Sequence, residues 1–171
     1  MIIRPVTRAD MKVFQDIMRT SIKAMCEPAY GAKTVAAWTS KDNPTFHFHL
    51  PKHAFAAEEG AEIIAIGGWS PTDAVELHPV GDRIIESPTH ARINAVYTRP
   101  GFEGRGLGRK MMTHLEADIT NRTDLRNIYL WSTKNAIPFY LANGYTQGVD
   151  EYPEAAKGFE IQVRYMWKRL G

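Results

Sequence analysis

Alternating and helical hydrophobic patterns divide the chain into short predicted elements. Residues 2–6 (IIRPV) form a β-type run, and Thr7 and Asp10 after it have the spacing of a capping box. Apolar residues then recur at the three- and four-residue steps of a helix with one buried face. Pro28 and Gly31 are predicted to end this helix.

Beyond residue 32 the pattern predicts a further series of helices and strands. Their order is a helix at 33–40, a strand at 53–58, a turn at Glu59 and Gly60, a strand from Glu62 to Trp69 closed by Pro71, a loop over 72–90, a strand at 91–98, a helix with Leu107, Met111, Leu115 and Ile119 on one face, a buried strand at 127–133 and a short helix ended by Gly144. The tail from Phe159 alternates cleanly, with Val163, Tyr165 and Trp167 on one side and Met166 on the other, which predicts one half-buried strand. This order predicts an α/β domain with a mixed sheet.

Length and composition bound the class of protein. A chain of 171 residues fits a single domain, 1–171, with a sizeable core. Its single cysteine, Cys26, has no partner for an internal disulfide, which favours a reducing compartment. A membrane-spanning helix needs about 20 apolar residues, and no apolar run in the sequence approaches this length. The first residues also lack the pattern of a signal peptide. We therefore expect a cytoplasmic monomer or homodimer that does not bind a membrane.

Charge is unevenly distributed along the chain. The net charge of +2 is too weak to predict a nucleic-acid partner. Residues 58–86 contain seven acidic residues and one basic residue, whereas residues 92–134 contain eight basic and four acidic residues. Two neighbouring parts of the chain thus carry opposite charge.

The stretch VYTRPGFEGRGLGRKMM, residues 96–112, contains three glycines at alternate positions between a predicted strand and a predicted helix: Gly104, Gly106 and Gly108. Unpaired amide groups at a helix start, together with the helix dipole, attract anions. The stretch therefore predicts a phosphate or pyrophosphate site, to which Arg105 and Arg109 add charge. A glycine-rich turn that binds nothing is the alternative that the spacing alone leaves open.

Two nucleotide motifs do not fit this stretch. A P-loop needs a serine or threonine after its lysine, and here Met111 follows Lys110. The dinucleotide fingerprint needs a different glycine spacing. Another phosphorylated ligand is therefore expected.

Two segments resemble motifs of one enzyme superfamily. VYTRPGFEGRGLGRKMMTHLE resembles the acetyl-CoA motif of the GNAT acetyltransferase superfamily, whose core is Q/R-x-x-G-x-G/A between a strand and a helix. STKNAIPFYLANGY resembles the motif that follows it, with Ala136, Tyr140, Gly144 and Tyr145 at the family's spacing. The resemblance covers residues 94–145. It implies a single GNAT-like domain with a mixed, mostly antiparallel sheet of about 6–7 strands and about four flanking helices.

The resemblance also implies how acetyl-CoA, as co-substrate, is bound. The backbone of Val96, Tyr97 and Thr98 would hydrogen-bond the pantetheine arm, and an N–H near Val96 would stabilise the charge that develops on the thioester oxygen. Thr133 and Asn135 would add side-chain bonds to this arm. The pyrophosphate would lie on the turn residues Glu103, Gly104, Arg105, Gly106, Leu107, Gly108 and Arg109. Two positions depart from the family pattern, because Glu103 replaces Gln or Arg and Thr133 replaces a frequent Asn.

Tyr140 is the catalytic residue that the resemblance implies. Its phenol, with an ordinary pKa near 10, stays protonated at neutral pH and can protonate the departing thiolate. The amine would attack the thioester directly in a ternary complex. The candidates for the base that accepts the amine proton are His53, Glu59, Glu62, His90 and the acid-rich loop, and the sequence does not rank them.

Histidines and aromatic residues offer further candidates. The segment HFHLPKH spaces His47, His49 and His53 at steps of two and four, but no carboxylate or cysteine accompanies them at ligand spacing, so we expect no metal. Three aromatic residues are candidates for the wall of an acceptor pocket, with core packing as the alternative: Trp38, Phe46 and Trp69.

The predicted function is transfer of an acetyl group from acetyl-CoA to a primary amine of a small molecule or peptide. The acid-rich segment suggests a cationic acceptor, such as a free amine, an amino sugar, a lysine or a peptide N-terminus. The alternative is a non-catalytic acyl-CoA-binding sensor of the same fold. An RNA-binding domain over residues 92–134 is disfavoured, because interleaved exposed aromatics and a high overall charge are missing, and we expect no nucleic-acid partner.

Overall fold

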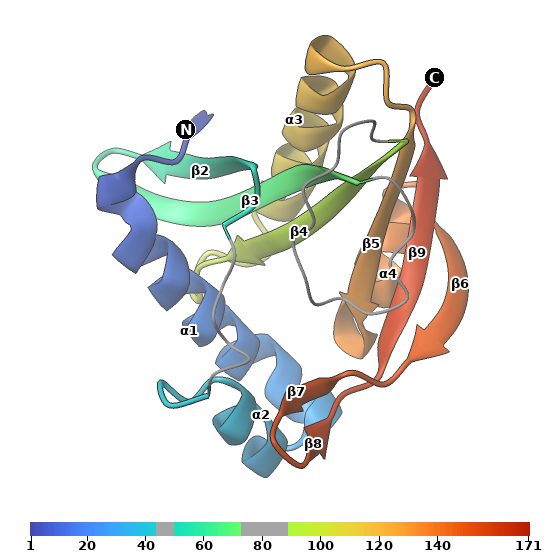
Figure 1. Cartoon of the computed structure of the whole chain (residues 1–171). Helices are drawn as coiled ribbons and strands as arrows, with labels where there is room; N and C mark the ends of the chain where they lie inside the picture. The colour runs from blue at the N-terminus through green and yellow to red at the C-terminus, as the bar shows by residue number, and fades with distance from the viewer. Residues whose placement is uncertain (44–49, 73–88) are drawn as a thin grey trace.

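The structure, a computed structural model, describes residues 1–43, 50–72 and 89–171 (Figure 1). These residues form a single α/β domain, which confirms the predicted fold class. Its elements in chain order are β1 (Ile2–Pro5), the 3-10 helix η1 (Arg8–Asp10), α1 (Met11–Tyr30), α2 (Ala32–Trp38), β2 (His53–Glu59), β3 (Glu62–Thr72), β4 (His90–Thr98), α3 (Leu107–Arg122), β5 (Asn127–Thr133), the 3-10 helix η3 (Lys134–Ala136), α4 (Ile137–Ala142), β6 (Thr146–Glu151), β7 (Glu154–Ala156), β8 (Phe159–Glu160) and β9 (Val163–Arg169).

Seven strands of the described chain form one mixed sheet in the order β1-β2-β3-β4-β5-β9-β6. β4 and β5 pair in parallel, and every other neighbouring pair in this sheet is antiparallel. Helix α3 is the crossover that parallel pairing requires. β7 and β8 form a separate two-stranded hairpin that lies beside α2 (Figure 1).

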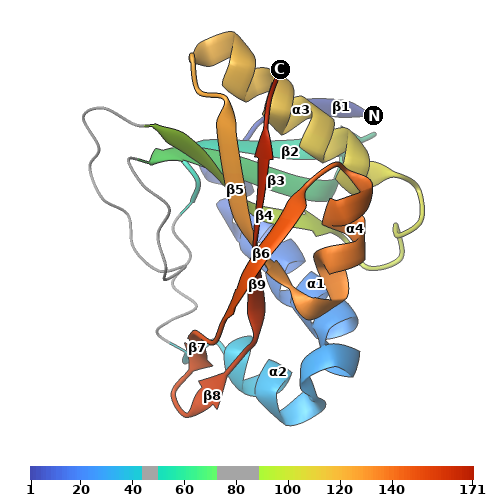
Figure 2. The same ribbon diagram turned by 90° about the vertical axis from the view of Figure 1, so that its right-hand side faces the viewer.

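Helices cover both faces of the sheet (Figure 2). On one face lie α3 and α4, and there Met111 of α3 and Leu130 of β5 belong to one buried cluster. On the other face lies α1, whose Phe14 is buried in a cluster with Ile66 of β3. Because both faces are covered, the central strands are apolar on both sides.

The parallel strands β4 and β5 separate soon after they meet. Their backbone pairing is limited to Ala91 with Ile128 and Arg92 with Tyr129. The pairing of β4 with β3 shifts register just beyond this point, where Ala95 has a φ of 57°. A left-handed residue in a strand marks a bulge, which bends the strand and increases its twist. The bulge thus helps to open the sheet between β4 and β5.

Gly31 ends α1 as predicted, but two prolines do not end their elements as the sequence suggests. α1 continues through Pro28 to Tyr30, because a proline in the last turn removes only one helical hydrogen bond, and Gly31 (φ 84°) ends the helix. β3 likewise continues through Pro71. At this position β3 pairs only with β4, since β2 begins opposite Trp69, and an edge position tolerates a proline.

The predicted single strand of the tail is also wrong. The chain breaks between β8 and β9, where Tyr30 Oη donates a hydrogen bond of 2.5 Å to the carbonyl of Gln162 and the Ile161 N–H donates one of 3.0 Å to the carbonyl of Pro153. These bonds direct the β7–β8 hairpin toward α1 and α2. The clean alternation in the sequence does not reveal the break, because it continues across both strands.

The buried side of β9 also differs from the prediction at its end. Met166, placed on the opposite side of the strand from the apolar series, is fully buried against α3, whereas Trp167 is 44% exposed. The reason is that α3 and α4 cover the Met166 side of this strand. On the other side of β9, Tyr30 and Trp38 pack only at the start of the strand, around Val163, and such a cover does not extend over Trp167 in the described part of the chain.

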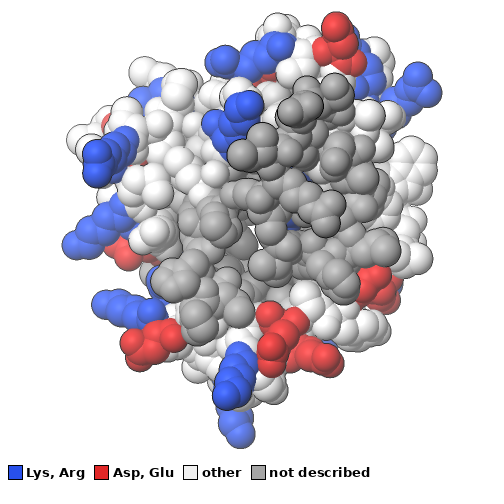
Figure 3. Space-filling view, in the orientation of Figure 1, with Lys and Arg blue, Asp and Glu red and all other residues white. Residues whose placement is uncertain are grey.

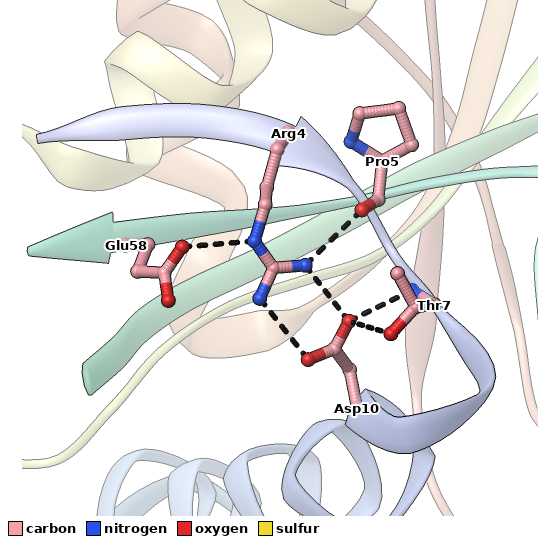
Figure 4. A network of polar contacts seen from close by, with 5 residues as sticks. All are labelled: Arg4, Pro5, Thr7, Asp10 and Glu58. Atoms are coloured by element: carbon pink, nitrogen blue, oxygen red, sulfur yellow. Dashed lines mark hydrogen bonds and ion pairs between the residues drawn. The ribbon is translucent and has the colours of Figure 1, made fainter. Parts of the chain in front are cut away.

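A polar network ties the first strand to the sheet (Figure 4). Arg4 binds Asp10 through two hydrogen bonds of 2.8 and 3.1 Å, and its Nε donates to Glu58 of β2 at 2.8 Å. Asp10 also accepts the N–H of Thr7 at 2.7 Å, as the predicted capping box requires. The Arg4 guanidinium and the Thr7 N–H hold the pKa of the Asp10 carboxyl well below its ordinary value.

The predicted loop at 72–90 lies almost wholly outside the described residues, which end at Thr72 and resume at Thr89. In the described ranges, no helix combines the length and apolar character that crossing a membrane requires.

Candidate active site

The turn between β4 and α3 has the geometry that the glycine spacing predicts. Gly104 and Gly106 have φ values of 72° and 73°, in the left-handed region that favours glycine. Gly106 caps α3, and the first bond it accepts comes from the Lys110 N–H at 3.0 Å. The intervening N–H groups of residues 107–109 have no helical acceptor and project at the mouth of the helix. Gly108 serves a different purpose, because it lets α3 approach α4 closely.

A cavity of about 410 Å³, here called the turn cavity, lies against this helix mouth. Its lining comprises Met25, Thr98, Phe102, Glu103, Gly104, Gly106, Leu107, Gly108, Arg109, Phe139, Ala142 and Asn143. The unpaired amides, the helix dipole and Arg109 make it suitable for an anion. Most of the predicted turn residues therefore line one cavity.

Two charged residues of the turn are engaged elsewhere. Arg105 donates to both carboxylate oxygens of Glu59 at 2.9 Å and does not line the turn cavity. Glu103, which lines it, accepts the N–H of Gly101 at 2.8 Å. The carboxylate that departs from the family pattern is thus held by the backbone of its own turn.

A second cavity, the central cavity, opens where β4 and β5 separate. It measures about 120 Å³ and is lined by Ser21, Met25, Cys26, Ile93, Asn94, Ala95, Val96, Tyr97, Leu130, Trp131, Thr133, Asn135, Ala136 and Tyr140. Met25 of α1 lines both this cavity and the turn cavity, so the two are adjacent. The Ser21 hydroxyl fixes α1 to the strand end by donating to the Thr98 carbonyl at 2.6 Å.

Tyr140 of α4 lies in the wall of the central cavity. Its ring packs edge-on against Phe139 and Tyr145, at centroid distances of 5.0 and 5.8 Å. Burial raises the pKa of its hydroxyl, which therefore stays protonated at neutral pH. Within the described residues this hydroxyl has no hydrogen-bond partner. A protonated hydroxyl that packing holds in place is suited to donate a proton.

Thr133 and Asn135 also line the central cavity, where both side chains lie near the Cys26 thiol. Burial raises the pKa of the Cys26 thiol to about 11, so this cysteine is a neutral packing residue rather than a nucleophile. The sequence predicted Thr133 and Asn135 as site residues. It did not indicate that α1 lines this cavity through Ser21, Met25 and Cys26.

A third cavity, the distal cavity, continues from the central one. It measures about 240 Å³ and is lined by Trp38, Arg92, Ile93, Asn94, Ala95, Tyr97, Trp131, Thr133, Pro153, Glu154, Ala155, Ile161 and Val163. Of the aromatic candidates for a pocket wall, Trp38 lies here, Trp69 is fully buried in the core and Phe46 is outside the described residues. The sequence missed Asn94, Trp131 and Glu154, because the first two look like ordinary strand residues and the third belongs to an unpredicted hairpin.

The four named candidate bases do not line any of these cavities, and the acidic residues of the acid-rich loop lie outside the described residues. His53 stacks on Trp69 with ring centroids 4.1 Å apart, and burial lowers its pKa. Glu62 forms an ion pair with Arg99 at 3.4 Å. His90 contacts the hydroxyl of the neighbouring Thr89, and Glu59 is held by the turn arginine.

The described acidic residues of the acid-rich segment are all paired. Glu58, Glu59 and Glu62 form ion pairs with Arg4, Arg105 and Arg99 respectively. The remaining acidic residues of this segment lie outside the described residues, as do His47 and His49. On the face drawn in Figure 3, the visible Lys and Arg side chains are interspersed with Asp and Glu. In the described ranges, no group of three or more His, Cys, Asp or Glu side chains is arranged to hold a metal ion.

Comparisons with known proteins agree with the fold. The model of the acetyltransferase (GNAT) family matches residues 18–145. A crystal structure described as a GCN5-related N-acetyltransferase from Rhodopseudomonas palustris is 20% identical, with a TM-score of 0.77 over 99% of this chain and 95% of that one. The PaiA N-acetyltransferase from Thermoplasma acidophilum, in complex with coenzyme A, is 14% identical, with a TM-score of 0.70 over 98% of each chain. The ribosomal-protein-alanine N-acetyltransferase from Brucella melitensis is 17% identical, with a TM-score of 0.65 over 99% of this chain and 100% of that one. No curated protein sequence matches the chain.

Proposed function

The chain belongs to the GNAT acetyltransferase family, and we propose that it transfers an acetyl group from acetyl-CoA to a primary amine of a small molecule or a peptide. The observation that carries this proposal is the row of three adjoining cavities, with Tyr140 in the wall of the middle one. The turn cavity, at one end of the row, suits the phosphates of the acetyl donor. The distal cavity, at the other end, has both apolar and polar residues in its lining and suits an acceptor without phosphate.

The residues present fit acetyl-CoA. The helix mouth at residues 106–109, with Arg109, offers unpaired amides and positive charge to the pyrophosphate. The edge of β4 that faces β5 is unpaired beyond Arg92, so backbone groups on this edge of Val96, Tyr97 and Thr98 are open to an extended, amide-containing arm, beside the Thr98 carbonyl that Ser21 already contacts. Thr133 and Asn135 face the same cavity from β5 and η3.

Tyr140 acts as the general acid in this proposal. The neutral amine nitrogen attacks the thioester carbonyl carbon, a C–N bond forms and the C–S bond breaks. The leaving sulfur takes the phenolic proton of Tyr140. The amine nitrogen releases one proton to water, and water returns a proton to the tyrosinate. A backbone N–H near Val96 stabilises the oxygen as it gains charge. Burial raises the pKa of Tyr140, so its hydroxyl is protonated at neutral pH and the proton is present when the thiolate leaves.

Replacement of Tyr140 by phenylalanine tests the proposal. Acetyl-CoA should raise the melting temperature of the wild type and of Tyr140→Phe equally. An acceptor screen should then show a kcat about a hundredfold or more lower for the variant at unchanged acetyl-CoA affinity. Because burial raises the pKa of Tyr140, wild-type activity should not fall at alkaline pH until above about pH 10. Binding of acetyl-CoA with no acetylation of any amine would instead indicate the acyl-CoA sensor.

A further inference from the structure

Asn94 and Trp131 occupy equivalent positions on the two separating strands. The last backbone pair between β4 and β5 joins Arg92 and Tyr129. Asn94 lies two residues after Arg92, and Trp131 lies two residues after Tyr129. Side chains two apart on a strand point to the same face of the sheet. Asn94 and Trp131 therefore project on the same side, from opposite walls of the opening, and both line the central and distal cavities.

Both side chains present a buried polar atom without a partner. Asn94 Oδ1, a hydrogen-bond acceptor, and Trp131 Nε1, a donor, are almost completely buried and have no hydrogen-bond partner in the described part of the chain. Leaving such atoms unpaired costs free energy, and buried polar groups in folded proteins are paired in nearly all cases. Two of them in the walls of one cavity indicate a ligand that supplies a complementary donor and acceptor.

The surroundings of this pair limit what the ligand can be. Trp38, Ala155, Ile161 and Val163 form an apolar part of the distal cavity wall. The carboxylate of Glu154, which also lines this cavity, accepts the N–H of Gly158 at 2.5 Å. Arg92 also lines this cavity, so it is the apolar part that suits a compact group with few polar atoms.

We propose that the acceptor is an amine with an amide group beside it, as in an amino acid amide or a peptide. The amide N–H donates to Asn94 Oδ1, and the amide carbonyl accepts from Trp131 Nε1. A planar amide carries one donor and one acceptor on separate atoms, which matches two complementary groups on two strands. The inference rests on the proposed amine acetylation and specifies the class of acceptor.

Variants of the two residues with matched acceptors test this inference. Phenylalaninamide and phenethylamine share the amine and the aromatic body, but only the first carries an amide. Trp131→Phe keeps an aromatic ring beside Tyr165 and removes the N–H donor. Asn94→Leu removes the acceptor, and Asn94→Asp keeps an acceptor oxygen. Comparing each variant with the wild type on the same acceptor cancels differences in amine basicity.

Trp131→Phe and Asn94→Leu should each lower kcat/KM for phenylalaninamide about tenfold, mainly through KM, and leave phenethylamine within about twofold. Asn94→Asp should retain more phenylalaninamide activity than Asn94→Leu. The affinity for acetyl-CoA should not change. If Asn94→Leu does not fold, Trp131→Phe alone decides the matter.

The outcomes separate this inference from the proposed function. If amines are acetylated but the variants affect both acceptors equally or neither, the amide inference is overturned and the proposed function stands. The amide inference is also overturned if the Asn94 and Trp131 variants lower activity toward an amino sugar such as glucosamine but not toward phenylalaninamide. If acetyl-CoA binds and no amine is acetylated, the proposed function and the inference fall together.

Discussion

Gly108 of α3 and Phe139 of α4 approach so closely that a Cβ on Gly108 would lie 3.1 Å from Cζ of the phenylalanine ring. The contact sets how near the helix mouth comes to the helix that carries Tyr140. The third glycine of the turn is thus explained by packing, whereas Gly104 and Gly106 are explained by their positive φ.

Gly108→Ala should force these two helices apart by a few tenths of an ångström. We expect a loss of about 1 kcal/mol in the free energy of unfolding, or about 2–4 °C in melting temperature, together with weaker acetyl-CoA binding. Phe139→Leu should rescue Gly108→Ala, because it removes the opposing ring atoms. The same substitution should not rescue Gly104→Ala, whose added Cβ meets no atom within 4 Å and whose cost is backbone strain at φ 72°. Equal rescue of both variants would contradict this account.

Glu59 should weaken acetyl-CoA binding, because it holds the side chain of Arg105 away from the turn cavity. Glu59→Gln removes the charge of this exposed pair and frees the guanidinium for phosphate. We expect acetyl-CoA to bind about two- to fivefold more tightly at low ionic strength, with the gain lost at high salt. Glu62→Gln is the matched control. Glu62 lies on the same β2–β3 hairpin as Glu59, but it pairs with Arg99, which does not line the turn cavity. Calorimetric titration that shows the same affinity for both variants would exclude this role.

The sequence predicted those parts of the candidate site whose geometry is local. The alternating glycines predict the helix mouth that the structure shows, and the motif spacing points to Tyr140, the proposed acid, because both features lie within short stretches of chain. The acceptor side was missed for a physical reason. It depends on the separation of β4 from β5, and the bulge there is at Ala95, an alanine in a left-handed conformation that residue type does not predict.

The sequence also did not predict which charged residues form ion pairs. Arg105 looks like a phosphate ligand because it lies between two glycines. The structure pairs it with Glu59, a residue 46 positions away. The pattern of β9 failed because alternation shows which residues share a side, but not which side a helix covers.

The two sides of β9 can be compared directly by mutation. Met166→Ala leaves a cavity under α3 and should cost about 2–5 kcal/mol in the free energy of unfolding. Trp167→Ala should cost less than about 1 kcal/mol, because its side chain is 44% exposed. Urea unfolding measures both values. A larger loss for Trp167→Ala would restore the assignment that the sequence pattern suggested.

Asp10 should make the stability of the protein depend on pH in the acid range. Arg4 and the Thr7 N–H lower its pKa in the folded state, so the folded protein binds this proton less readily than the unfolded chain. The stability that Asp10 contributes is therefore present above the ordinary aspartate pKa of about 4 and is lost as the pH falls toward the folded-state pKa.

Asp10→Asn should accordingly unfold about 1–2 kcal/mol more easily than the wild type at pH 7, because the side chain is only 12% exposed and its bonds to Arg4 are charge-assisted. The difference should be constant between about pH 7 and 5 and should shrink below about pH 4, where the unfolded carboxyl becomes protonated. Asp16→Asn, at an exposed position of α1, is the control and should show a small difference throughout. Urea titrations across this range measure both differences. A gap between Asp10→Asn and the wild type that is as wide at pH 3 as at pH 7 would show that the ionised carboxylate is not what stabilises this network.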